Sequence, residues 1–300
     1  MRPVSLIFTF AFLSFSACTG YASEVVFASL NNNVRKQVDR FTRLEVYLEK
    51  ELEDIGVTDV RLEVFQDPKL LSQSLESGRA DFYFDSPLVA AKIGAPAGAE
   101  MFLRRWKRGV GKYHSVIFVK SDSGLQSLDD LRGKRIAMQD PASTSGYLLP
   151  VSILSGYSLP LAEIKSREDM PAEDAVGYIF TGDDKNTALW VAKGFVEAGA
   201  TDNVTFAQLE KVAPGQYRSL ARSSDLPRQV LLKRKGLDPV VAQRVADVLT
   251  SMHRTEEGRR ILLKFNKTTK FERFQEGPEE TMAPLLEILD TLAGADMNGW

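Results

Sequence analysis

The chain has 300 residues, of which 44% are hydrophobic and 26% charged, a balance typical of a globular protein with ample length for a core. Its formal net charge of −2 excludes the strongly basic surface that proteins use to bind nucleic acid or an acidic membrane. A protein of this composition that binds anions must therefore rely on local geometry.

Residues 1–22 have the pattern of an export signal: Arg2, then an apolar stretch at 4–15, then small residues. The apolar stretch is too short to span a bilayer as a helix. The only cysteine of the chain leaves two alternatives open, because Ser16-Ala17-Cys18 resembles a lipoprotein cleavage box, whereas cleavage after Ala22 would remove Cys18. In both cases the exported domain has no disulfide.

Strands and helices alternate from residue 24 onwards, with strands predicted at 24–30, 60–65 and 80–84 and helices at 34–55 and 68–76. This alternation favours an α/β fold with a parallel, doubly wound sheet. Ligands of such sheets bind beyond the carboxyl ends of the strands. Asp85 and Ser86 stand at such an end and are candidate ligand-binding residues. Asp85 could instead cap the helix that follows.

The middle of the chain contains its most basic run, Arg104 to Arg108, which we interpret as a solvated loop. A strong strand is predicted at 113–119. The only two histidines, His114 and His253, are far apart, and no cysteine follows the signal region. We therefore expect no metal site, no cofactor and no Cys/His nucleophile.

The most informative segment runs from Gln139 to Pro150, Gln-Asp-Pro-Ala-Ser-Thr-Ser-Gly-Tyr-Leu-Leu-Pro, directly after a predicted strand at 135–138. Ser143 is placed to be the N-cap of a helix through Leu154. A helix start has unpaired N–H groups and partial positive charge, and here three hydroxyl groups surround it. This arrangement suits a small oxyanion. The alternative is that the hydroxyl groups only cap the helix, since serine and threonine are common N-cap residues.

Gly146, within that segment, would let a ligand or another part of the backbone approach closely. After it we predict a strand at 177–180, a turn at 181–186 and a helix at 187–193. Helices at 239–252, 255–265 and 284–292 complete the chain.

These pieces together resemble the phosphonate, phosphite and phosphate solute-binding family of bacterial ABC importers. The matching residues are Asp-Pro-x-Ser-Thr-Ser-Gly-(aromatic)-Leu-x-Pro at 140–150 and Tyr-x-Ser-Val-x-x-Val at 113–119. A further pattern, Ser-Leu-x-x-Leu-x-Gly-Lys at 127–134, is shared by many related binding proteins. The long loop motif is the specific one.

The resemblance implies a type II periplasmic-binding-protein fold, with two α/β lobes joined by two crossing segments. For this chain it implies one lobe from 24–118, a second lobe from 119–222, and a return to the first lobe with C-terminal helices in 223–300. The first crossing would lie near 116–121 and the return near 220–231.

The resemblance also implies site residues. Ser143, Thr144, Ser145 and Gly146 match the family's anion-binding loop, and Tyr113 matches a tyrosine of the cleft. The chain departs from the family at other positions of the cleft. A second tyrosine of the family falls at Pro68, a histidine falls near Asp184, and two acidic residues fall at Val204 and Gln229. Asp184 facing the cleft beside Asp85 would disfavour a plain dianion, and its alternative role is a turn or cap residue.

We therefore expect a monomeric periplasmic protein, lipid-anchored if Cys18 is retained, that binds a small anion and delivers it to the membrane permease of an ABC importer. The alternative is a ligand-sensing accessory protein for a membrane receptor kinase. An enzyme of the same shape would need a titratable pair, for which Asp85 and Asp184 are the only candidates, so we expect no enzyme. Nucleic acid is not an expected partner.

Overall fold

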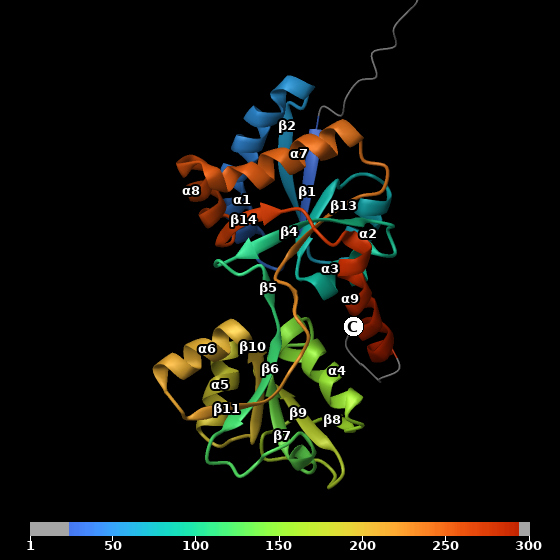
Figure 1. The fold of residues 1–300 in the computed structure, drawn as a ribbon. Coiled ribbons are helices and arrows are strands. Elements are labelled where there is room, and N and C mark those ends of the chain that lie inside the picture. Colours follow the sequence, from blue (N-terminus) through green and yellow to red (C-terminus); the bar gives the residue numbers. More distant parts are fainter. Residues whose placement is uncertain (1–23, 294–300) are drawn as a thin grey trace, which may run out of the picture.

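The structure is a computed structural model that describes residues 24–293, and its two six-stranded β-sheets lie at the centres of two lobes (Figure 1). The expected export signal and Cys18 lie outside the described residues. No helix among residues 24–293 combines the length and the apolar character needed to cross a membrane.

The first lobe contains a six-stranded sheet. Its strands are β1 (Glu24–Leu30), β2 (Asp59–Phe65), β3 (Phe82–Asp85), β4 (Glu100–Lys107), β13 (Val230–Lys233) and β14 (Thr268–Glu272). They lie in the order β14-β4-β13-β3-β1-β2. The helices of this lobe are α1 (Val34–Leu52), α2 (Pro68–Glu76), α3 (Pro87–Gly94), α7 (Pro239–Ser251) and α8 (Glu256–Lys264).

The second lobe contains another six-stranded sheet. Its strands are β6 (Ser115–Lys120), β7 (Arg135–Met138), β8 (Leu161–Glu163), β9 (Val176–Phe180), β10 (Ala198–Asp202) and β11 (Tyr217–Arg222), in the order β11-β6-β10-β7-β9-β8. Its helices are α4 (Leu149–Gly156), α5 (Asp184–Ala192) and α6 (Asn203–Val212), and a π-helical turn, η3 (Thr144–Leu148), precedes α4. The two-lobed α/β fold is thus confirmed.

Local sequence explains the first helices. Asn33 caps α1 by accepting a hydrogen bond from the Lys36 N–H, and the face of α1 that carries Phe41, Leu44 and Leu48 is completely buried. Helix α2 has the predicted bounds, because Asp67 caps it and proline occupies its first turn.

The alternation of strands and helices predicted a parallel sheet, and this prediction is wrong in part, because each six-stranded sheet contains both parallel and antiparallel pairs. β1 pairs in parallel with β2 and β3, whereas β13 is antiparallel to β3 and β4. In the second sheet β6 is antiparallel to β10. β6 and β13 are the strands with which the chain enters each lobe from the other, so no crossover helix fixes them parallel to their neighbours.

Two short antiparallel strands, β5 (Lys112–Tyr113) and β12 (Leu226–Pro227), pair between the lobes, and we call this pair the linking ribbon (Figure 1). The expected first crossing at 116–121 is wrong, because these residues lie almost entirely within β6 of the second sheet. The apolar run of β6 is buried in that sheet, and the chain changes lobes just before it.

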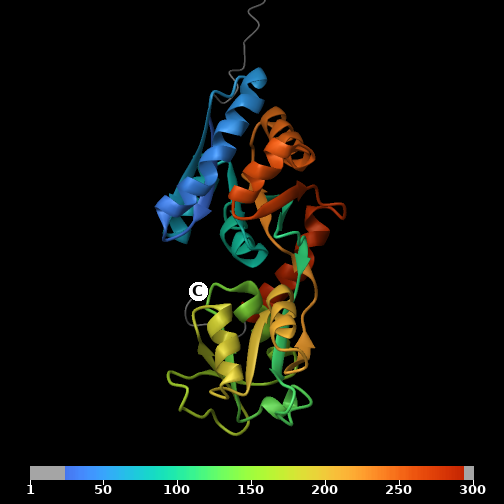
Figure 2. The ribbon, with the colours of Figure 1, turned by 90° about the vertical axis from the view of Figure 1, so that its left-hand side faces the viewer.

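The lobes also touch directly. α3 of the first lobe packs against η3 of the second, and one hydrophobic cluster contains Leu88 and Val89 from the first lobe and Leu148 from the second. The last helix, α9 (Pro278–Ala293), contacts α3 and β4 on one side and α4 on the other, and lies beside the junction in both views (Figures 1 and 2). α9 therefore bridges the two lobes.

Candidate ligand-binding site between the lobes

The loop after β7 has the conformation that its sequence predicts at its start. Ser143 is the N-cap of η3, because its hydroxyl oxygen accepts a hydrogen bond from the Gly146 N–H at 3.0 Å. The same hydroxyl donates to Gln139 Oε1 at 2.6 Å. The Ser143 hydroxyl group is therefore occupied by local hydrogen bonds in this conformation.

Position 146 must be a glycine, because the Gln139 side chain packs closely against its backbone. A Cβ atom at this position would lie 2.5 Å from Gln139 Cβ and 2.9 Å from Ser143 Oγ, closer than such atoms pack in proteins. The expected close approach is thus present, and the neighbour is the Gln139 side chain.

Thr144 and Ser145 are buried at the start of η3. Only 3% of Thr144 is exposed, and its Oγ1 atom has no hydrogen-bond partner among the described residues. The Ser145 carbonyl oxygen accepts a hydrogen bond from the Ser115 hydroxyl at 2.7 Å, which anchors the loop to β6. A buried hydroxyl without a partner is costly, so Thr144 Oγ1 is available to a ligand or water.

Tyr113 of the linking ribbon lies beside this loop. Only 2% of Tyr113 is exposed, and burial raises the pKa of its hydroxyl to about 12, which keeps it a neutral donor. Thr144 is near enough to lower that pKa, although its Oγ1 does not reach hydrogen-bond geometry with the phenol. The Asp85 carboxylate also raises the pKa of Tyr113, so a residue of the first lobe is near the same ring.

Asp184 lies in the second lobe at the start of α5. Its carboxylate accepts a hydrogen bond from the Thr201 hydroxyl at 2.8 Å. Burial raises the pKa of Asp184, Thr201 opposes this effect, and the Asp202 charge adds to it, while Arg228 lowers the pKa. Asp184 thus belongs to a charged group with Asp202 and Arg228, and Asp183, not Asp184, is the N-cap.

Asp85 and Ser86 occupy the end of β3 in the first lobe. Asp85 accepts hydrogen bonds from the Tyr83 hydroxyl at 2.7 Å and from the Ser86 N–H at 2.6 Å. Burial nevertheless raises the pKa of Asp85. The alternative role of Asp85, as the cap of the following helix, is wrong, because Ser86 is the cap residue of α3.

The basic run is not a solvated loop. Arg104, Arg105 and Lys107 belong to β4, and 7% of Arg104 and 3% of Arg105 is exposed. Strand pairing with β13 and β14 places this run inside the sheet of the first lobe. The carboxylates that accompany it follow more than 160 residues later, so the charge run alone does not reveal its burial.

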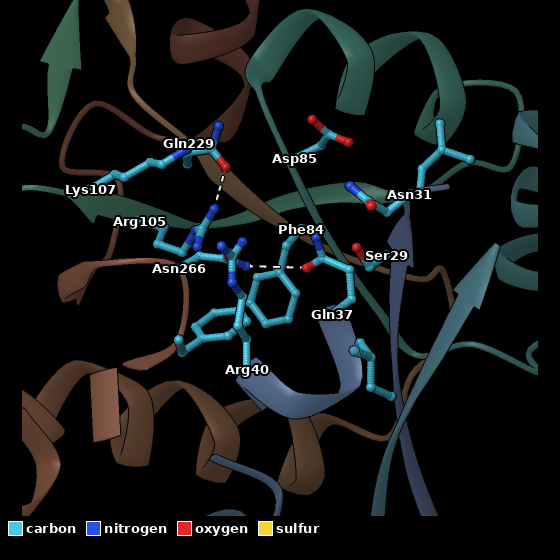
Figure 3. Close-up of a pocket in the computed structure, with 13 residues that line it drawn as sticks. Ser29, Asn31, Gln37, Arg40, Phe84, Asp85, Arg105, Lys107, Gln229 and Asn266 are labelled. Atoms are coloured by element: carbon cyan, nitrogen blue, oxygen red, sulfur yellow. Dashed lines mark hydrogen bonds between the residues drawn. The ribbon is translucent and has the colours of Figure 1, made fainter. Parts of the chain in front are cut away.

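A polar pocket of about 270 Å³ opens where β1, β3 and β4 end, and we call it the basic pocket (Figure 3). The residues that line it are Ser29, Leu30, Asn31, Gln37, Arg40, Leu62, Phe84, Asp85, Arg105, Lys107, Gln229, Phe265 and Asn266. Asp85 was expected here from its place at a strand end. The cations Arg40, Arg105 and Lys107 were not expected.

A second pocket, of about 500 Å³ and mainly apolar, joins the two lobes. It is lined by Pro68, Val89 and Ile93 from the first lobe and by Pro141 and Ala142 from the second. Pro68 therefore lines the same pocket as Pro141 and Ala142 of the loop after β7. Ser143 to Gly146 line neither of these two pockets.

The structure brings the sequence-predicted residues together in part. Tyr113 lies beside Thr144 and within electrostatic reach of Asp85, while Asp184 belongs to the Asp202 group of the second lobe. Sequence reasoning missed Asp202 and Arg228, since this ion pair of 3.2 Å joins α6 to the end of the linking ribbon. Among residues 24–293, no cluster of three or more histidine, cysteine or acidic side chains could hold a metal ion.

Comparison with known proteins identifies relatives. The chain is 28% identical over 184 residues to the phosphate-import protein PhnD of Mycolicibacterium smegmatis, covering 58% of this chain and 55% of that protein. It is 27% identical over 198 residues to the phosphonates-binding periplasmic protein of Escherichia coli, covering 63% of this chain and 55% of that protein. The matched region thus spans about half the length of these curated relatives.

Solved structures share the fold. XAC2383 from Xanthomonas citri, bound to a chloride ion, has a TM-score of 0.77 and 27% identity, covering 90% of this chain and 99% of that one. PhnD1 from Prochlorococcus marinus, in complex with methylphosphonate, has a TM-score of 0.62 and 16% identity over 90% of this chain and 98% of that one. The family model described as ABC transporter, phosphonate, periplasmic substrate-binding protein matches residues 28–277, and the chain belongs to that family.

Proposed function

We propose that this protein is the extracytoplasmic solute-binding component of an ABC importer, and that it binds a small oxyanionic solute of the phosphonate, phosphite or phosphate class between its lobes. Membership of the family supports the transport role. The family consists of substrate-binding proteins rather than enzymes, in line with a protein that carries its ligand unchanged.

One observation supports the location of the site most directly. Thr144 Oγ1 is buried without a hydrogen-bond partner, beside the neutral donor Tyr113 and at the start of a helical turn. Hydrogen bonds to a charged oxygen contribute about 1.5–3 kcal/mol each, more than bonds between neutral groups. An oxyanion held by Tyr113, Thr144, Ser145 and the N–H groups at the start of η3 would satisfy the Thr144 hydroxyl.

The arrangement of the lobes supports binding by closure. The ribbon that links them is short, and Tyr113 belongs to it, so a ligand that contacts Tyr113 and Thr144 touches both the ribbon and the second lobe. Proteins of two lobes commonly close around a ligand by hinge motion. The permease of the importer would then receive the closed, loaded form.

The ligands bound in related structures support the proposal that this protein binds an anion. The structural relative from Xanthomonas citri has been solved with a chloride ion and with ATP, and the one from Prochlorococcus marinus with methylphosphonate. All three ligands are anions. We transfer to this chain only the chemical class that they share.

A thermal-shift screen of phosphate, phosphite, alkylphosphonates and sulfonates tests this proposal. A ligand at about a hundred times its dissociation constant stabilises a protein by about 2.7 kcal/mol. Thr144→Val keeps the shape of the side chain and removes the hydroxyl, so it should weaken the binding of the selected oxyanion by about tenfold or more. Thr250→Val, on helix α7, is the matched control.

Two results would contradict the proposal. One is a screen in which no oxyanion raises the melting temperature. The other is calorimetry in which Thr144→Val binds the selected oxyanion as tightly as the wild type does, which would place the anion away from the loop.

A further inference from the structure

The cations that line the basic pocket share one property, which is that their described hydrogen-bond partners are not carboxylates. Arg40, Arg105 and Lys107 line it together, and none of them forms an ion pair with a carboxylate whose side chain the structure describes. Figure 3 shows the three side chains on the same side of the pocket, facing Asp85 and Asn31.

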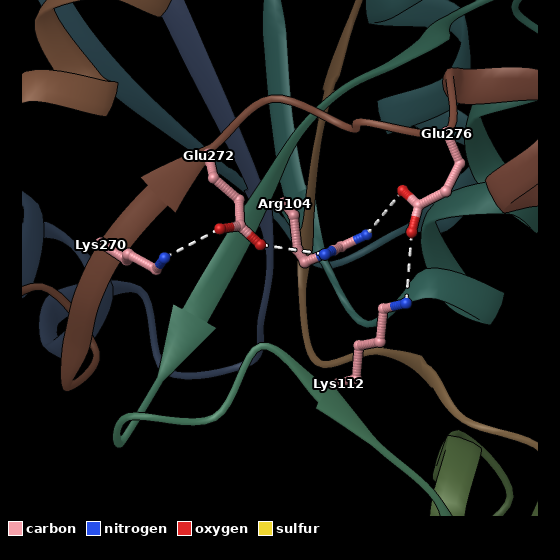
Figure 4. Close-up of polar contacts among 5 residues, drawn as sticks. All are labelled: Arg104, Lys112, Lys270, Glu272 and Glu276. Carbon is pink, nitrogen blue, oxygen red and sulfur yellow. Dashed lines mark hydrogen bonds and ion pairs between the residues drawn. The ribbon is translucent and has the colours of Figure 1, made fainter.

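Two neighbouring arginines of β4 show the contrast most clearly. Arg104 is almost fully buried and is paired with Glu272 at 2.9 Å and with Glu276 at 3.3 Å (Figure 4). Lys112 and Lys270 extend the same network. Arg105 is buried to a greater degree, and since consecutive strand residues point to opposite faces, it cannot reach these carboxylates.

The partners of Arg105 are all neutral. It donates to Gln229 Oε1 and to the Thr268 hydroxyl at 3.1 Å, and its guanidinium lies 5.1 Å from the Phe265 ring centre. Its Nε atom is buried and has no hydrogen-bond partner. A buried cation without a counter-charge is unfavourable, so an anion bound in the pocket would stabilise the charge of Arg105.

Lys107 and Arg40 add to the positive charge. Burial lowers the pKa of Arg105 to about 10 and that of Lys107 to about 8, and the charge of Arg105 contributes to the lower pKa of Lys107. Arg40 donates to Asn266 Oδ1 at 2.6 Å, which fixes its guanidinium at the pocket wall. The charges of Arg105 and Lys107 thus repel one another at the pocket, whose wall also carries Arg40.

Among the described residues that line the pocket, Asp85 is the only one with a carboxylate. It is engaged by the Tyr83 hydroxyl and by Ser86, and forms no ion pair with Arg105, although its charge acts on that arginine. One carboxylate and three cations leave the pocket positively charged. The charge of Asp85 also raises the pKa of Tyr113, which lies beside Thr144, so one residue of the pocket wall is within electrostatic reach of the proposed oxyanion site.

We propose that the basic pocket binds a second anionic group of the ligand, so that the transported solute carries two separated anionic groups, one for each lobe. This inference rests on the proposed function, because it assigns the first group to Thr144 and its neighbours. A ligand of this kind connects the lobes through both ends. An organic acid that carries a phosphonate at one end and a carboxylate at the other has the required chemistry.

Calorimetry with two matched series of ligands tests this inference. The first series is phosphonoacetate and its homologues with two and three methylene groups; the second is alkylphosphonates of equal length, which lack the carboxylate. The wild-type protein should bind the best phosphonocarboxylate about tenfold or more tightly than its alkyl counterpart. Lys107→Gln should remove most of this preference and leave the affinity for alkylphosphonates unchanged.

Lys211→Gln, on helix α6 of the other lobe, removes the same charge outside the pocket and should change neither series. Equal affinity of the wild type for both series would overturn the inference, as would a Lys107→Gln variant that weakens both series equally or neither. If alkylphosphonates bind and Thr144→Val weakens them while these results are negative, the proposed function stands without the second group. If neither series binds, both proposals fail.

Discussion

The guanidinium of Arg228 lies over the ring of Tyr113, with its central carbon 4.5 Å from the ring centre. Tyr113 ends one strand of the linking ribbon, and Arg228 directly follows the other. The same guanidinium donates to the buried carboxylate of Asp202 at 3.2 Å, and the other oxygen of Asp202 caps α6. Arg228 therefore fastens both strands of the ribbon to the second lobe.

Arg228→Gln should destabilise the protein by about 3 kcal/mol, because removing one partner of a buried pair leaves the other charge uncompensated. We expect the low end of the range for such pairs, since Asp202 keeps its hydrogen bonds from the N–H groups of Val204 and Thr205. Urea unfolding measures the change. Arg273→Gln breaks a half-exposed pair with Asp247 and should cost at most about 1 kcal/mol. Equal losses in the two variants would argue against the role of Arg228.

Local signals in the sequence were sufficient for the elements that begin with a cap. The predicted helix at 68–76 has the bounds of α2, and Ser143 was placed correctly as the cap that begins η3 after a buried strand. The order of such elements also predicted the α/β class, whereas the division into two lobes was implied by the resemblance to the family. These signals are carried by neighbouring residues, so they can be read without knowledge of the tertiary structure.

The charged positions could not be read in the same way. Arg104 is buried because Glu272 and Glu276 approach it from the far end of the chain, and a run of arginines is more often solvated. The pair of Arg228 and Asp202 likewise depends on the path of the linking ribbon. Burial of a charge is decided by distant partners, which local sequence does not specify.

Gly146→Ala should destabilise the protein by about 1–3 kcal/mol, because the added methyl group would overlap Gln139 and the Ser143 cap. Gly156→Ala is the control, since an added Cβ there meets no atom within 4 Å and the residue ends helix α4. That substitution should leave stability unchanged or raise it by up to about 1 kcal/mol. Thermal unfolding that shows no loss for Gly146→Ala would mean that the loop rearranges without cost.

Asp184→Asn should raise the affinity for oxyanions by about fivefold, equivalent to about 1 kcal/mol, because it removes a negative charge near the proposed site. The amide oxygen can still accept the hydrogen bond from Thr201, so the start of α5 should keep its structure. Asp174→Asn, a change of the same charge at an exposed loop, is the control. Calorimetry in which both variants bind as the wild type does would place Asp184 too far from the anion to act on it.

Lys107 should make the stability of the unliganded protein depend on pH in a definite window. Burial, reinforced by the charges of Arg105, Arg228 and Arg108 and opposed by that of Asp85, lowers the pKa of Lys107 in the folded protein to about 8 from the ordinary value of 10.5. Between these values the unfolded chain binds more protons than the folded protein does.

The contribution of Lys107 to the free energy of unfolding should therefore increase with pH from about 8 to about 10.5, and be constant below and above this window. Subtracting the pH profile of Lys107→Met from that of the wild type isolates this contribution, because the other titrating groups are common to both. Lys211→Met, with its side chain outside the basic pocket, should give a profile parallel to the wild type. If the wild-type profile stays parallel to that of Lys107→Met through the window, Lys107 is fully hydrated. The basic pocket would then lack the unsatisfied positive charge that is proposed to attract an anion.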